Sequence, residues 1–220
     1  MSELASFVRD QLGHSTRKLD LFERALTHSS VGGDSYERLE FLGDRVLGVV
    51  IARALYDRHP GEPEGSLSER YNALVARETC AEVGRELGIP AQLRLGKQAR
   101  GDGASQSDNV VGDAVEALIG ALLLDGGMSE AERFILARWE PYLAGQGLAP
   151  QHPKSGLQEL AAARGRKPPV YEIVSRTGAH HSPKFTVRVS VGSLGEATAE
   201  GSSKQEAETA AAAALLEQLQ

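Results

Sequence analysis

The chain has 220 residues and carries 24 basic and 30 acidic side chains, a net charge of −6. This length allows one large domain or two small ones, and the 41% apolar content excludes disorder along the whole chain. The single cysteine, Cys80, excludes an internal disulfide, and no apolar run is long enough to cross a bilayer. The first residues lack the apolar stretch of a secretory signal. We therefore expect a cytoplasmic protein without membrane contact.

The charge is unevenly distributed along the chain. Residues 151–220 hold 8 basic and 7 acidic side chains, a net charge of +1, which leaves 16 basic and 23 acidic side chains for residues 1–150. A net acidic chain argues against a simple nucleic-acid binder, whose surface is usually basic. Acidic groups that hold metal ions would gain positive charge from those ions, so both possibilities stay open.

The first two thirds of the sequence predicts helices and no strand. Residues 96–108, rich in Gly, Ser, Asp and Gln, predict an exposed loop, and Gly and Pro residues mark the helix ends. Apolar residues recur at helical spacing over five segments: 19–27, 35–59, 66–87, 109–125 and 129–142.

The pattern changes after residue 143. A segment rich in Gly, Pro, Gln and Ala predicts a flexible linker. Apolar and polar residues then alternate as in strands, and the predicted elements are a helix over 155–164, strands over 170–177, 184–191 and 195–201, and a helix over 203–218. This order predicts an α+β domain, an antiparallel sheet with two helices on one face. The predicted fold is an all-α domain (1–146), a linker (147–153) and an α-β-β-β-α domain (154–220).

Three carboxylates share one face of the predicted helix over 35–59. Because a helix turns about 100° per residue, Glu37, Glu40 and Asp44 fall within roughly 60° of each other. The opposite face is apolar and is expected to pack into the core; it carries Leu39, Leu42, Val46, Val49 and Val50.

A second acidic pair, Asp113 and Glu116, shares a face of the predicted helix over 109–125, beside small residues that allow another helix to approach. Two such helices packed together could bring four carboxylates into one pocket. Crowded carboxylates raise each other's pKa unless a cation neutralises them, and oxygen-only ligands favour Mg²⁺, which suits phosphodiester cleavage. Acids at this spacing are also common as solvated surface groups, so the spacing alone leaves both interpretations open.

Three segments carry a resemblance to a known family. Residues 37–46, ERLEFLGDRV, resemble the signature helix of the ribonuclease III family. The upstream segment ALTHS (25–29) and the downstream segment DAVEA (113–117) resemble its other nuclease motifs in the right order. The C-terminal part resembles a double-stranded-RNA-binding domain, so the resemblance covers nearly the whole chain and matches the bacterial architecture.

The resemblance implies an endoribonuclease that cuts double-stranded RNA with Mg²⁺, or with Mn²⁺ as an alternative ion. It implies a homodimer with one acidic centre per subunit, which leaves 5′-phosphate and 3′-hydroxyl ends with a short 3′ overhang and processes ribosomal and other structured RNA precursors. Water activated by the metal would attack. Glu40, Asp44, Asp113 and Glu116 would form the metal site, with Asp44 and Glu116 the most critical for the chemistry.

Further residues match family positions less specifically. Glu37 and Glu64 match acids that line the family's cleft, although either could be a surface acid. Phe41 lies on the face of the acids, and its family counterpart packs into the partner subunit; an ordinary half-buried Phe is the alternative. Arg45 stays outside the predicted site, because it fits a phosphate contact and a surface ion pair equally well.

In the C-terminal domain the resemblance implies RNA contacts at Gln158, Glu159, His180, His181, Ser203 and Lys204. The sequence departs from the family here: AEG at 199–201 replaces a Gly-x-Gly turn, and KQE at 204–206 replaces a run of lysines. Fewer cations release fewer counterions, so we expect modest RNA binding by this domain alone. A protein–protein module is the alternative.

Two other functions compete with this hypothesis. The first is a non-catalytic double-stranded-RNA-binding protein on a decayed nuclease fold, but decay should have removed acids and all four are present. The second is a helical metal-dependent phosphohydrolase acting on nucleotides. That class commonly uses His-Asp ligands, and it would leave the C-terminal α-β-β-β-α unit unexplained.

Overall fold

The structure, a computed structural model, describes residues 2–145, 153–179 and 182–219. Its contacts divide the chain into two compact units, Met1–Pro150 and Gln151–Gln220. The predicted linker lies outside the described residues except for Pro153, and His180 and His181 lie outside them as well. Within the described ranges, no helix is long and apolar enough to cross a membrane.

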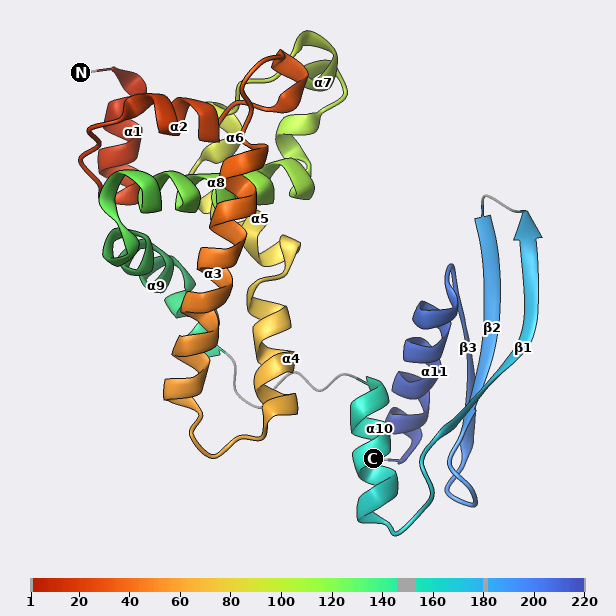
Figure 1. The fold of residues 1–220 in the computed structure, drawn as a ribbon. Coiled ribbons are helices and arrows are strands. Elements are labelled where there is room, and N and C mark those ends of the chain that lie inside the picture. The colour runs from red at the N-terminus through yellow and green to blue at the C-terminus, as the bar shows by residue number, and fades with distance from the viewer. Residues whose placement is uncertain (1, 146–152, 180–181, 220) are drawn as a thin grey trace. The chain divides into compact units, whose positions relative to one another are not determined.

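The first unit is built from helices, in agreement with the predicted all-α class. Its elements in chain order are α1 (Glu3–Leu12), α2 (Leu19–Ala25), the 3₁₀ turn η1 (Ser29–Val31), α3 (Glu37–Arg58), α4 (Glu64–Leu74), α5 (Arg77–Glu86), α6 (Ile89–Gln92), α7 (Lys97–Gly101), the 3₁₀ turn η2 (Ala104–Gln106), α8 (Asp108–Gly126) and α9 (Met128–Gly145). Figure 1 shows α8 crossing α3, with α4 running beside the second half of α3.

The core of this unit forms around α8, whose sequence is apolar on almost every side. Val111, Val115, Leu118 and Leu122 are fully buried against the neighbouring helices. Helices α3, α5 and α9 pack on it. Asp113 and Glu116 of α8 are only half-buried and occupy a part of its surface that the other helices leave partly uncovered.

Two glycines let α3 and α8 touch through their backbones. A Cβ atom at Gly43 would lie 1.7 Å from the carbonyl oxygen of Glu116, and one at Gly120 would lie 2.4 Å from that of Leu39. No side chain fits at such separations. The crossing point is therefore fixed by glycine, and the acids one turn away on each helix are brought together.

The segment 66–87 forms two helices where the sequence predicted one. Helix α4 ends at Leu74, Ala76 is extended with ψ 147°, and α5 begins at Arg77. The buried Trp139 donates an indole hydrogen bond of 2.8 Å to the carbonyl oxygen of Leu74. The hydroxyl of Thr79 likewise donates to Ala73. These bonds stabilise a helix break at a point where the sequence has neither Gly nor Pro.

Three smaller expectations also need correction. Helix α1 was not among the predicted elements, and the predicted loop 96–108 contains α7 and η2. On α3, Leu42 is only half-buried and Val49 is 61% exposed, although both were expected in the core. The described part of the first unit leaves that side of α3 largely uncovered, so apolar spacing alone did not distinguish a packed face from an exposed one.

The second unit has the predicted α-β-β-β-α order. It consists of α10 (Pro153–Ala163), β1 (Val170–Ala179), β2 (Ser182–Ser190), β3 (Glu196–Gly201) and α11 (Lys204–Leu219). The strands form an antiparallel sheet in the order β1-β2-β3, and Figure 1 shows both helices on one face. Leu157 and Leu215 of the helices are buried with Val189 of the sheet. The α+β class is confirmed.

The glycine contact predicts opposite effects of the same substitution at two helical positions. Gly43→Ala should destabilise the protein by about 3 kcal/mol or more, because its methyl group would collide with backbone. Gly65→Ala in α4, where a Cβ meets nothing within 4 Å, should stabilise it by up to about 1 kcal/mol. Urea unfolding measures both. Equal effects at the two sites would show that the crossing is not tight.

Candidate metal centre

Three carboxylates meet where α3 crosses α8. Glu40 comes from the first turns of α3, and Asp113 and Glu116 lie three residues apart on α8. One oxygen atom from each lies within 4.8 Å of the others. They line a pocket of about 290 Å³. The structure therefore brings three of the four residues predicted as metal ligands close together.

Burial and mutual repulsion disfavour the charged forms of these acids. The pKa of Glu116 is raised to about 7, chiefly by burial and then by the charges of Asp113 and Glu40. Burial also raises the pKa of Glu40 and of Asp113. A divalent cation would relieve this repulsion, and a donor set made only of oxygen suits a hard ion. The residues present therefore fit the metal that the sequence implies.

The fourth predicted ligand, Asp44, also lines the pocket but is oriented differently. Its carboxylate forms an ion pair with Arg45, its neighbour in the sequence. It does not belong to the group of oxygens that lie within 4.8 Å of one another. Arg45, which was left out of the predicted site, lines the same pocket.

Three further pocket neighbours were not predicted. Tyr36, at the start of α3, donates a hydrogen bond of 3.3 Å to Asp113, and burial raises the pKa of its phenol. The thiol of Cys80 lies 4.0 Å from Glu116, and burial followed by the nearby acids raises its pKa to about 12. Arg77 lines the pocket from the first residue of α5. Of these three, only Tyr36 could have been suspected from the sequence, because it directly precedes the signature segment 37–46.

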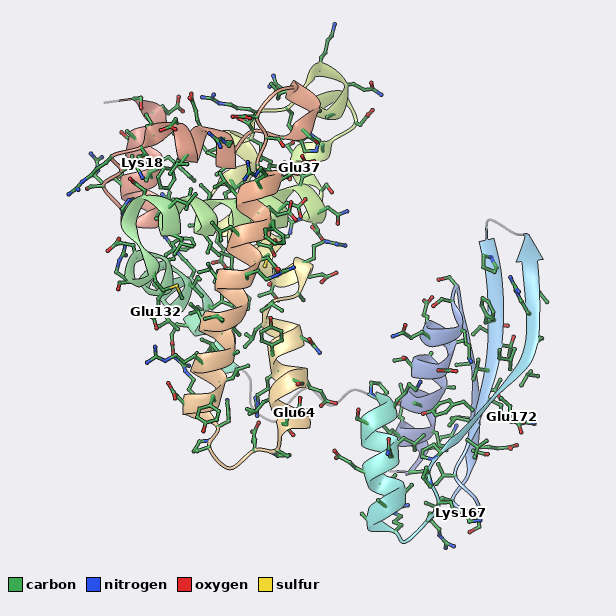
Figure 2. The ribbon with its side chains drawn as sticks, in the orientation of Figure 1. Lys18, Glu37, Glu64, Glu132, Lys167 and Glu172 are labelled. Atoms are coloured by element: carbon green, nitrogen blue, oxygen red, sulfur yellow. The ribbon has the colours of Figure 1, made fainter. Side chains whose placement is uncertain are left out.

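Neither of the predicted accessory acids lines the pocket, although the charge of Glu37 acts on Glu40. Figure 2 shows Glu37 at the first turn of α3 and Glu64 at the opposite end of the α3–α4 pair. Both are exposed; Ser35 donates to Glu37 at 3.0 Å and Ser68 to Glu64 at 2.6 Å. Phe41 is 64% exposed at the edge of the pocket.

In the second unit, the described RNA-contact candidates are exposed. Gln158 and Glu159 lie on α10, and Ser203 and Lys204 lie at the start of α11. The ammonium group of Lys204 is 3.7 Å from Glu208. Other cations of this unit are also paired with acids; these pairs are Lys154–Glu208, Lys184–Glu200 and Arg188–Glu172. The other four cations described in this unit, Arg164, Arg166, Lys167 and Arg176, form no ion pair with an acid of the described residues and stay available to a polyanion.

An oxygen-lined pocket between crossing helices, joined to a separate α-β-β-β-α unit, is an architecture suited to metal-dependent cleavage of a nucleic acid. A sequence profile described as Ribonuclease-III-like matches residues 18–142, and one described as a double-stranded RNA binding motif matches residues 153–219. The chain belongs to the ribonuclease III family of endoribonucleases, which is metal-dependent, and its second unit is a double-stranded-RNA-binding domain.

Individual relatives agree with this assignment. The chain is 59% identical to Ribonuclease 3 of Zymomonas mobilis subsp. mobilis over 212 residues, which cover 96% of this chain and 86% of the relative. It is 46% identical to Ribonuclease 3 of Caulobacter vibrioides over 94% of this chain and 92% of the relative. The crystal structure of the ribonuclease III nuclease domain from Campylobacter jejuni aligns with a TM-score of 0.61 at 29% identity, covering 64% of this chain and 97% of that one.

The raised pKa of Glu116 predicts how the stability of the metal-free protein depends on pH. The folded protein keeps this proton up to about pH 7, whereas the ordinary pKa is 4.5. The stabilising contribution is therefore complete below the ordinary value and is lost as pH rises through the folded value. Urea unfolding in EDTA should show that wild type loses stability relative to Glu116→Gln as the pH rises from 4.5 to about 7.

Added Mg²⁺ should stabilise wild type more at the alkaline end of this range, because it binds the deprotonated acids. Glu217→Gln, at an exposed position of α11, is the control and should follow wild type at every pH. Parallel curves for wild type and Glu116→Gln would contradict the prediction.

Proposed function

We propose that this chain hydrolyses phosphodiester bonds of double-stranded RNA as a Mg²⁺-dependent homodimer, with Mn²⁺ as an alternative ion. The observation that carries the proposal is the pocket in which Glu40, Asp113 and Glu116 present oxygens within 4.8 Å of one another. The products would be 5′-phosphate and 3′-hydroxyl ends with a short 3′ overhang. The cellular substrates would be ribosomal and other structured RNA precursors.

The residues of the pocket would have different roles in this reaction. Glu40, Asp44, Asp113 and Glu116 would hold the metal, which when bound supplies Lewis-acid activation of the phosphodiester and of water. Tyr36 orients Asp113 through its hydrogen bond. The buried Cys80 keeps its proton and adds no charge beside Glu116. Asp44 and Glu116 would matter most for the chemistry, as their match to the family's motifs implies.

The second unit would position the duplex. We assign residues 1–146 to the nuclease domain, 147–153 to a linker and 154–220 to the RNA-binding domain. Gln158 and Glu159 on α10 suit 2′-hydroxyl groups of a minor groove, and Ser203 and Lys204 offer the N-terminus of α11 to phosphates. His180 and His181 would reach a second minor groove. Because four of the eight cations described in this unit are paired with acids, its binding would gain affinity from the dimer.

An exposed apolar stripe on α3 supports the homodimer. Phe41, Val49 and Tyr56 are 64%, 61% and 72% exposed and share one side of the helix. A two-fold axis beside this stripe would place α3 against its copy, so that each subunit contributes one pocket and cuts one strand. A second Campylobacter jejuni nuclease-domain structure, 30% identical with a TM-score of 0.60, is described as having a region involved in dimer formation.

We propose the cytoplasm as the site of action. The one cysteine, Cys80, is free and buried, which fits a reducing compartment. The non-catalytic alternative is not favoured, because the carboxylates of the pocket are all retained.

The first experiment is cleavage of a long RNA duplex in Mg²⁺ by wild type and by the double variant Asp44→Asn, Glu116→Gln. The variant should lose activity by about a thousandfold or more, because the metal can no longer be held for chemistry. It should still retain the duplex on a native gel. Single-stranded RNA and duplex DNA should stay uncut. Retention without cleavage by wild type would instead identify a binding protein.

The dimer is tested separately by substitution on the stripe. Phe41→Glu should shift the protein from dimer to monomer, because it places a charge in an apolar interface. Light scattering after gel filtration measures the mass. Val31→Glu, at another half-exposed apolar residue outside α3, is the matched control and should remain dimeric. A monomeric wild type would exclude the proposed assembly.

A further inference from the structure

Arg45 links three features of the pocket edge. Its guanidinium pairs with the carboxylate of Asp44, and its central carbon lies 5.1 Å from the centroid of the Phe41 ring. It also lines the acidic pocket. Its side chain is 66% exposed; the aromatic ring and the carboxylate of Asp44 are its direct contacts, and its charge also acts on Glu116.

The ion pair accounts for the separation of Asp44 from the other acids. Glu40, Asp113 and Glu116 crowd together, whereas the carboxylate of Asp44 already has a cationic partner. Exposed ion pairs contribute little free energy, because water solvates both partners well. A divalent cation held by the other three acids would attract Asp44 more strongly than a guanidinium does. Asp44 is therefore able to exchange Arg45 for a divalent cation.

A released Arg45 would have one obvious new partner. Guanidinium groups bind phosphate through paired, charge-assisted hydrogen bonds. The RNA strand must bring a phosphate to this same pocket if the proposed function is right. Arg77 faces the pocket from another helix, so a phosphate entering it would meet a cation from α3 and one from α5.

We propose that Arg45 is a positioning residue that exchanges partners: it neutralises Asp44 while no metal is bound, and it turns to a phosphate of the RNA strand once Asp44 takes up the metal. This inference rests on the proposed function. It has a distinctive consequence, because Arg45 competes with the metal but assists the RNA. Removing it should therefore affect the two ligands in opposite directions, whereas a loss of folding would weaken both.

The first arm measures Mn²⁺ binding to the full-length protein by calorimetry, without RNA. Arg45→Ala should bind Mn²⁺ about two- to fivefold more tightly, the range expected from releasing one exposed ion pair. In the Asp44→Asn background the same substitution should have no effect, since the competing pair is already broken. Arg58→Ala, which removes an arginine paired with Glu140 at the far end of α3, is the matched control.

Arg77→Ala separates a specific exchange from general electrostatics. It removes a pocket-lining cation that is not paired with Asp44, so its effect on Mn²⁺ affinity should be clearly smaller. The inference would be overturned if Arg77→Ala raised the Mn²⁺ affinity as much as Arg45→Ala does. It would also be overturned if Arg45→Ala still raised the Mn²⁺ affinity in the Asp44→Asn background. An unchanged or reduced Mn²⁺ affinity in Arg45→Ala would overturn it as well.

The second arm measures binding of an RNA duplex in Ca²⁺, a hard ion that oxygen ligands also accept. Arg45→Ala should bind the duplex more weakly and with a shallower salt dependence, because one phosphate contact per subunit is lost. Unchanged RNA binding would overturn the inference. Failure of the proposed function would look different. Wild type would then either not bind Mn²⁺ or bind it as well as Glu116→Gln does.

Discussion

The backbone contact between α3 and α8 is the constraint on which the site depends. Gly43 and Gly120 allow the two helices to approach so closely that a single methyl group at either position would collide with a carbonyl. Glu40 lies three residues before one glycine and Glu116 four residues before the other, about one helical turn in each case. The acids therefore project from the two helices into one pocket. Side chains at the crossing would separate the helices, and with them the oxygens.

This closeness has an electrostatic cost that explains the chemistry of the pocket. Each of the three acids has a raised pKa, and burial is the first cause for every one of them. Tyr36 and Arg77 offset only part of the effect of burial on the pKa of Asp113, and Arg45 and Arg77 offset only part of the effect of burial and repulsion on that of Glu116. The metal-free pocket therefore favours cation binding, because a cation neutralises carboxylates whose charged forms are disfavoured by burial where α3 crosses α8 and by one another. Stability and metal affinity are coupled through the same carboxylates.

The sequence predicted the features that depend on local periodicity and missed those that depend on distant partners. Helical spacing identified the helices that carry the acids, and strand alternation identified the α-β-β-β-α unit. The break after Leu74 depends on Trp139, which lies 65 residues further along the chain, so no local pattern could reveal it. The exposure of Val49 depends on which helices fail to cover it. The orientation of Asp44 toward Arg45 depends on side-chain geometry that spacing does not determine.

The charge distribution now has a physical explanation. A chain of net charge −6 must bring a polyanion to a pocket walled by acids, and the second unit, in which four of the eight described cations are paired with acids, has a net charge of only +1. At the pocket itself, the attraction would come from metal ions bound by the carboxylates and from Arg45, which we propose the metal releases from Asp44. On this view the acidic first unit is no obstacle to RNA binding. If Arg45 exchanges partners as we propose, the duplex is held for cleavage only when the pocket contains the metal.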